Sequence, residues 1–220
     1  MGCIARSFTI WGLPRFAESP PAMPILVDKD ERRSQVVAIA FDLIADRGIE
    51  ALTFRQIAAA IGCSTSIVSH YFRNKNELLF KVYQVANNLA RERLCLARGA
   101  GLPLLSCFDA ILPVDEQARR NWRVWLAFWS RAHLEPAYLE ERRRAAQDSL
   151  ALYRAMLAES LGAAPADTAV DIAARRLIAV VAGIGLEACF DPEDWSAERM
   201  HEVLAAELAD LAAAMRASAP

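Results

Sequence analysis

Residues 53–79, TFRQIAAAIGCSTSIVSHYFRNKNELL, decide the fold because they predict two short helices joined by a tight turn. Thr53 can cap the first helix, and Gln56, three residues later, can reach back to complete a capping box. Gly62 ends that helix, since glycine readily adopts the left-handed conformation of a helix stop. Ser64 then opens the second helix as its capping residue.

The second helix has a polar face, which a core helix does not need. Val68 and Phe72 form its apolar side, and its other side offers hydrogen-bonding groups from Thr65, Ser66, Ser69, His70 and Tyr71. The DNA major groove accepts a short polar helix held at a fixed angle by the helix before it. The pattern therefore favours a DNA-binding helix-turn-helix over a hairpin buried in an all-α core.

The segment from Gly62 to Leu79 resembles the helix-turn-helix of the TetR family of one-component repressors. The matching features are the glycine at the turn, Tyr71-Phe72 at the end of the recognition helix and Lys75 at the start of the next. Residues 67–72 are most similar to the BetI-type branch, whose best known member responds to choline. The resemblance implies a homodimeric, ligand-responsive regulator of transcription.

The resemblance also assigns roles to single residues of the motif. Four of them are expected to face base edges, namely Thr65, Ser66, Ile67 and His70, and Ile67 can contact a thymine methyl group. Thr53, Tyr71 and Lys75 are expected to contact phosphates, and Arg55 a phosphate or a base. Ser69 stands where many members have tyrosine, which removes one phosphate contact. An exposed His70 that makes no contact remains an alternative.

Composition predicts an all-α protein, because alanine supplies much of the 55% hydrophobic content and the 220 residues include only 9 Gly and 10 Pro. Residues 28–80 are expected to form a three-helix DNA-binding domain and residues 81–220 a helical bundle for effector binding and dimerisation. Residues 1–27 have the composition of a flexible tail. Met23 is a candidate true start, which would make the preceding stretch a misassigned extension.

Pro, Gly and capping residues divide the chain further into helices. Besides the two helices of the motif, the predicted ranges are 30–47, 75–98, 102–112, 115–133, 136–161, 165–190 and 196–216. The small amino-terminal core is expected to be marginal alone and to lean on the helix over 75–98. Movement at the far end of that helix could then swing the DNA-binding head.

Charge is distributed unevenly along the chain. Residues 28–98 hold 11 Lys and Arg against 8 Asp and Glu, a net charge of +3, whereas residues 99–220 hold 12 against 18, a net charge of −6. A basic head joined to an acidic body fits a DNA-binding sensor, although ordinary scatter of surface charge can also give +3.

The sequence argues against an enzyme, a cofactor, a metal site and a membrane protein. None of the three histidines lies in a nucleophile motif, and the sequence has neither a Gly-rich phosphate loop nor a metal-spaced cluster. The five cysteines include no Cys-x-x-Cys pair, which fits a reducing cytoplasm. The longest apolar run, residues 177–186, is too short to span a bilayer.

The last two predicted helices are candidates for a homodimer interface. The helix over 165–190 is apolar nearly all round, and a partner subunit can supply the cover that it needs. The expected interface residues are Ile172, Leu177, Val180, Val181, Ile184, Val203, Leu204 and Leu208. An intrachain core in a monomer is the alternative.

Trp122, Trp125 and Trp129 share one face of the helix over 115–133. A bundle core is the commoner meaning of such a stripe, and an effector cavity is the alternative. Tryptophan faces attract quaternary ammonium ions by cation–π contact, and Asp109 or Glu187 could balance the charge. The effector is therefore choline or another quaternary amine, or else belongs to a different class.

The predicted function is a repressor that binds a palindromic operator as a dimer, with recognition helices ~34–36 Å apart, and that a ligand releases. An activator with the same architecture fits the sequence equally well. The alternative from another class is a helical adaptor protein without operator binding.

Overall fold

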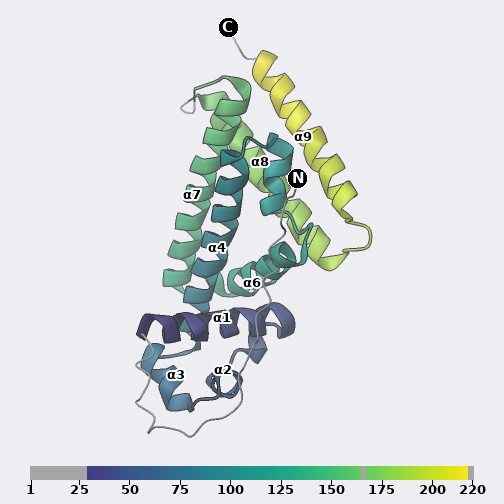
Figure 1. Cartoon of the computed structure of the whole chain (residues 1–220). Helices are drawn as coiled ribbons and strands as arrows, with labels where there is room; N and C mark the ends of the chain where they lie inside the picture. The colour runs from purple at the N-terminus through teal and green to yellow at the C-terminus, as the bar shows by residue number, and fades with distance from the viewer. Residues whose placement is uncertain (1–28, 165–166, 218–220) are drawn as a thin grey trace, which may run out of the picture.

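The computed structural model describes residues 29–164 and 167–217, and all regular elements in these ranges are helical (Figure 1). The helices are α1 (Lys29–Arg47), α2 (Phe54–Ile61), α3 (Thr65–Tyr71), α4 (Lys75–Gly99), α5 (Leu104–Cys107), α6 (Glu116–Ala132), α7 (Pro136–Leu161), α8 (Thr168–Phe190) and α9 (Ala197–Ala217), with 3-10 turns η1 (Ile49–Ala51) and η2 (Phe108–Ala110).

The all-α prediction is thereby confirmed, and the predicted ranges agree to within a few residues in most cases. The predicted helix over 102–112 is instead split into α5 and η2. The expected tail over residues 1–27 lies outside the described residues. None of the described helices has the length and apolarity that a bilayer crossing requires.

Local capping explains where the long helices begin. The side chain of Asn74 accepts a hydrogen bond from the Glu77 N–H at 2.9 Å, which starts α4. Asp115 accepts from the Ala118 N–H at 2.7 Å and so starts α6. Pro136 occupies the first position of α7, where its missing N–H costs no intrahelical bond.

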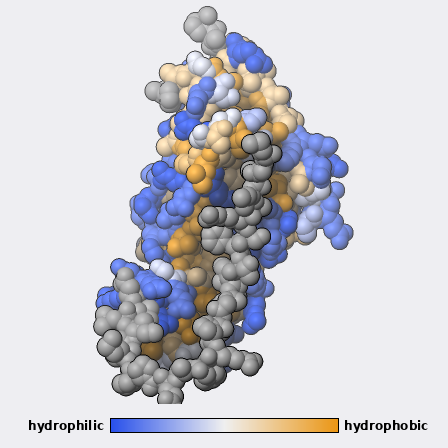
Figure 2. Space-filling view, in the orientation of Figure 1, coloured by the Kyte–Doolittle hydropathy of each residue, from blue (hydrophilic) through white to orange (hydrophobic). Residues whose placement is uncertain are grey.

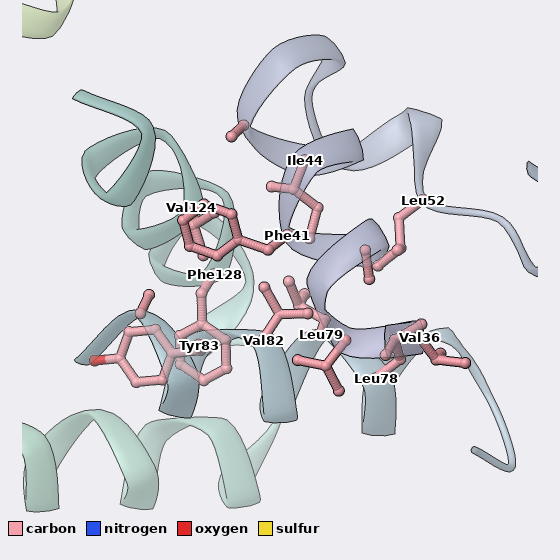
Figure 3. Packing of buried hydrophobic residues seen from close by; sticks show 14 of the residues in the cluster. Val36, Phe41, Ile44, Leu52, Leu78, Leu79, Val82, Tyr83, Val124 and Phe128 are labelled. Carbon is pink, nitrogen blue, oxygen red and sulfur yellow. The ribbon is translucent and has the colours of Figure 1, made fainter. Parts of the chain in front are cut away.

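The amino-terminal head formed by α1, α2 and α3 shares one hydrophobic core with α4 and α6. The apolar side chains of the head are buried at Ile44, Leu52, Ile57, Val68 and Phe72 and half-buried at Ile49 and Phe54. Figure 3 shows the side chains that continue this core into α4 and α6, among them Leu79, Val82, Tyr83, Val124 and Phe128, with Phe41 of α1 beside them. The head therefore leans on α6 as well as on α4.

A second core lies farther along the chain, where α5, η2 and the end of α4 pack with α7, α8 and α9. Its largest buried side chains include Phe108, Leu112, Tyr153, Leu157, Leu177 and Leu204. Figure 1 shows α4 running from the head up beside α7, with α6 crossing between α1 and the bundle. On the same face, Figure 2 shows hydrophilic residues along the outer edge of α7.

Burial separates the expected dimer-interface residues into two groups. Leu177, Val181, Ile184 and Leu204 are at most 3% exposed, because their side chains fill the second core of the chain itself. Val180, Val203 and Leu208 are half-buried, and Ile172 is exposed. The large apolar side chains that α8 leaves exposed are Ile172, Leu186 and Phe190.

Candidate DNA-binding surface and effector cavity

The turn between α2 and α3 fixes the angle between the two helices. Thr53 caps α2 by accepting a hydrogen bond from the Gln56 N–H at 3.2 Å. Gly62 adopts the left-handed conformation with φ 71°, and the N–H of Cys63 donates back to the Ala58 carbonyl at 2.9 Å. Both features follow from the sequence pattern. Ser64 occupies the cap position of α3, but its hydroxyl pairs with that of Ser66 at 2.7 Å.

Helix α3 turns its apolar side inward and leaves its polar side free. Val68 and Phe72 are fully buried in the head, whereas all four residues expected to face base edges, Thr65, Ser66, Ile67 and His70, are exposed. Ile67 is 41% exposed, which is an unusual position for a large apolar side chain in so small a head. Ser69 bonds its own helix, because its hydroxyl donates to the Thr65 carbonyl at 3.0 Å.

The residues expected to contact phosphates lie around α3. Thr53 and Arg55 are exposed at the start of α2, and no described residue pairs with the Arg55 guanidinium. Tyr71 is half-buried, with its ring edge-on to that of His70 at 5.2 Å between centroids. Lys75 stands at the N-terminus of α4, 3.8 Å from Glu50. A helix N-terminus attracts phosphate groups.

A cavity of about 370 Å³ lies between α4, α6, α7 and α8. Its walls include all three tryptophans of the stripe, Trp122, Trp125 and Trp129, together with Tyr83 and Tyr153. Burial raises the pKa of the Tyr153 phenol above its usual range, so the phenol stays neutral. A volume of this size suits a small organic molecule.

The three tryptophans pack against one another as well as against the cavity. The Trp122 ring lies edge-on to both others, and the rings of Trp125 and Trp129 are parallel with centroids 6.3 Å apart. Trp122 donates its N–H to the Ile111 carbonyl at 2.7 Å. The buried indole N–H of Trp125 has no hydrogen-bond partner among the described residues, so it is a free donor beside the cavity. The stripe is therefore both core and cavity wall.

Asp109 and Glu187, expected to balance a cationic ligand, do not line the cavity. Asp109 faces α9 instead, where one carboxylate oxygen lies 2.5 Å from His201 Nε2, and Glu187 is exposed on α8. The acidic groups that do line the cavity are Glu141 and Asp148 of α7. Sequence reasoning missed Glu141, because it lies in the charged run of residues 140–144, where nothing distinguishes it from its neighbours.

The face of α6 away from the cavity is joined to the head by arginines. Arg120 forms ion pairs with Asp42 and Asp46 of α1, each at 2.5 Å. Arg123 donates to the Ala45 carbonyl at 3.3 Å, and Arg131 to the Glu50 carboxylate at 3.2 Å. One helix thus contacts the cavity with its tryptophans and the DNA-binding head with its arginines.

The fold and the site together define a class of regulators in which a helix-turn-helix domain is followed by a helical bundle with a ligand cavity. Comparison with known proteins narrows this class. The family model for bacterial regulatory proteins of the tetR family matches residues 36–82, and that for the C-terminal part of BetI-type transcriptional repressors matches residues 103–213. The chain belongs to the TetR family of transcriptional regulators, with a BetI-type C-terminal region, which confirms the resemblance.

Individual relatives agree with this assignment. The chain is 29% identical to the transcriptional regulator PksA of Bacillus subtilis over 83% of its own length and 90% of that protein. It is 31% identical to the regulator BetI of Escherichia coli, in a match that spans 52% of this chain and 62% of BetI. These families and relatives are transcriptional regulators, so the prediction that the chain is not an enzyme is confirmed.

Solved structures show the same fold. A transcriptional regulator from Rhodococcus sp. Rha1 aligns with a TM-score of 0.72 and 25% identity over 81% of this chain and 95% of that one. A transcriptional regulator from Saccharomonospora viridis, solved in complex with choline, aligns with a TM-score of 0.71 and 23% identity over 80% and 94%.

Proposed function

We propose that the protein is a dimeric repressor that binds a palindromic operator and leaves it when a quaternary amine, choline or a close analogue, enters the cavity. The observation that carries the proposal is the double contact of α6. Its tryptophans line the cavity and its arginines bind α1 of the head, so an effector has a direct route to the DNA-binding surface.

DNA recognition is assigned to the exposed face of α3. Thr65, Ser66, Ile67 and His70 are proposed to read base edges, with Ile67 suited to a thymine methyl group because its apolar side chain is exposed. Thr53, Arg55, Tyr71 and Lys75 are proposed to hold phosphates. Arg55 is exposed and its guanidinium has no ion-pair partner among the described residues, whereas Lys75 lies near Glu50 and the Thr53 hydroxyl already caps α2.

The effector class is supported by the aromatic wall of the cavity. Tryptophan faces attract quaternary ammonium ions by about 0.5–2 kcal/mol. Trp122, Trp125 and Trp129 are proposed as ligand contacts, with Glu141 replacing Asp109 and Glu187 as the balancing carboxylate, since Glu141 lines the cavity. The structural neighbour from Saccharomonospora viridis, which binds choline, supports the same class.

The homodimer interface is assigned to the outer faces of α8 and α9. Exposed Ile172, Leu186 and Phe190 would meet their symmetry mates, with half-buried Val180, Val203 and Leu208 beside them. Gly183 is also exposed on α8, where its lack of a side chain lets a partner helix approach closely. Two-fold symmetry would place the two α3 helices about one DNA turn apart.

Release is proposed to begin at α6 and to reach the head through α1 and α4. Because the head shares its core with α4 and α6, a ligand that shifts the tryptophan face of α6 also shifts the base on which the head rests. The two heads then lose the spacing that the operator requires. The ligand can do this only to the extent that it binds the released state more tightly than the DNA-bound one.

The test starts from an operator selected out of genomic fragments by gel shift with the full chain. Fluorescence anisotropy then compares operator affinity with and without saturating choline, betaine, other quaternary amines, amino acids and aromatic acids. A drop in affinity with quaternary amines, lost in Trp125→Ala and Trp129→Ala, is expected. Equal affinity with every amine present would reject the effector class, and failure to shift any fragment would favour an adaptor protein.

A further inference from the structure

The cavity already contains a cation that belongs to the chain itself. The guanidinium carbon of Arg142, on α7, lies 4.8 Å from the centroid of the Trp129 ring, and both residues line the cavity. This distance is within the ~6 Å range of cation–π attraction. Arg142 therefore occupies aromatic surface that an incoming ammonium ion would use.

Among the residues that the structure describes, no carboxylate forms an ion pair with Arg142. Its two neighbours on α7 both have carboxylate partners: Arg143 lies 3.9 Å from Glu140, and Arg144 binds both oxygens of Glu141 at 2.7–3.1 Å. The indole of Trp129 is thus the main stabilising contact of the Arg142 charge. Arg142 is half-buried, and a single cation–π contact is weak enough for a ligand to displace its guanidinium.

Two features of the cavity that favour a cation are both filled by arginines of one helical turn. Arg142 covers the Trp129 ring, and Arg144 neutralises the nearly buried carboxylate of Glu141. A positively charged ligand that binds at the Trp129 ring or at Glu141 therefore has to displace one of these two side chains.

We propose that Arg142 is an internal competitor of the effector, a specificity-determining side chain that holds the aromatic site until a better cation displaces it. The inference rests on the proposed function, because it concerns the same cavity and the same cationic effector. Displacement also breaks a contact between α7 and α6, so the exchange of one cation for another loosens the helix that carries the head.

The competition explains how the cavity selects among amines. Guanidinium is weakly hydrated for a cation, so it leaves water for an indole face at low cost. A competitor has to leave water as easily. A quaternary ammonium ion has no N–H groups to solvate and meets this condition, whereas a primary ammonium ion is strongly hydrated and does not. Arg142 thus sets a threshold that every amine has to exceed, and a primary amine of similar size falls short of it.

The experiment is isothermal titration of the full-length protein with choline and with its uncharged isostere, in which carbon replaces the quaternary nitrogen. Arg142→Met should bind choline about 5- to 30-fold more tightly than the unaltered protein, which corresponds to the upper part of the cation–π range because Arg142 is half-buried. The isostere should bind both proteins within about twofold, since it does not compete for the ring as a cation. Arg142→Gln serves as a second variant should the methionine variant fold poorly.

Arg143→Met is the matched control, because it removes the same charge one residue away from an exposed ion pair. Its effect on choline binding should stay within about twofold, as expected of surface pairs. Choline binding that is unchanged or weaker in both Arg142 variants overturns the competition while the proposed effector class stands. An equal gain for choline and the isostere also overturns it, because the cause is then freed space. If no variant binds any quaternary amine, the effector class and the competition both fail.

Discussion

Replacing Gly185 by alanine probes the contact that joins the cavity wall to α8. A Cβ added at Gly185 would lie within 3.0 Å of three carbon atoms of the Trp122 indole, a separation that real Cβ atoms essentially never show. Trp122 cannot easily retreat, since it is 2% exposed and its N–H is bonded to the Ile111 carbonyl at 2.7 Å. The methyl group must therefore displace either the indole or helix α8.

The magnitude follows from three opposing contributions. Overpacking a well-filled core costs about 1–3 kcal/mol, and losing the indole hydrogen bond adds about 1 kcal/mol. In the opposite direction, alanine stabilises a helix by about 1 kcal/mol relative to glycine. The net loss is about 1–3 kcal/mol, which for a chain of this size lowers the Tm by roughly 2–12 °C.

Thermal unfolding at one fixed protein concentration measures this loss in a Phe190→Asp background, in which the proposed dimer contact of Gly183 is removed, with Gly183→Ala as the control. Gly183 lies on the same helix, and nothing stands within 4 Å of a Cβ built there, so its substitution should stabilise the subunit by up to ~1 kcal/mol. Adding Gly185→Ala to a Trp122→Leu background should reverse its sign, because the clashing indole is gone. Such a reversal is the coupling expected of two residues in contact.

The reasoning is refuted if Gly185→Ala is at least as stable as Gly183→Ala, or if its cost is the same with and without the indole. Either result would mean that α8 and α6 adjust to one another freely. The tryptophan wall would then not be rigid enough to carry a signal from the cavity.

Four further outcomes are expected. Arg120→Ala, which removes both ion pairs from α6 to α1, should reduce the effector-induced change in operator affinity several-fold by anisotropy, whereas Arg119→Ala should not. Arg55→Ala should lower the slope of log K against log salt by about two, one for each subunit of the dimer, if Arg55 binds a phosphate. Phe190→Asp should shift the protein from dimer to monomer in sedimentation velocity, because Phe190 is 76% exposed on the proposed interface. Asp115→Ala should cost about 1 kcal/mol at pH 7. Burial works to raise the pKa of Asp115, but hydrogen bonds hold it lowered, so its stabilisation is present at neutral pH and the difference in urea unfolding should shrink below about pH 4.

The sequence predicted local structure well because local chemistry decides it. Gly62, Asp115 and Pro136 end or begin helices through their own backbone preferences and caps, which need no tertiary information. The same holds for the exposed polar face of α3, whose position relative to Val68 follows from helical periodicity. Such features are visible in one chain without any knowledge of its partners.

Periodicity shows which residues share a face but not what covers that face. Leu177 and Ile184 were expected at a dimer interface, yet α7 and α9 of the same chain cover them. Asp109 lies close to the tryptophans along the sequence but pairs with His201, 92 residues away. The cavity residues Glu141 and Arg142 belong to a helix with many charges, where neither stands out from its neighbours. Long-range pairing of this kind depends on how the helices pack together.

The double contact of α6 places a quantitative limit on how the regulator can work. Each ion pair from α6 to α1 is partly exposed and contributes only about 0.2–1 kcal/mol, so the arginines cannot hold the head rigidly by themselves. The buried contacts of Phe41 with Val124 and Phe128 are non-directional but much larger in sum (Figure 3). Packing therefore keeps the head attached to α6, and the ion pairs set its angle. An effector needs to alter only the weaker of these two interactions, which is within reach of a ligand whose own contact with the tryptophan wall is worth about one or two kcal/mol.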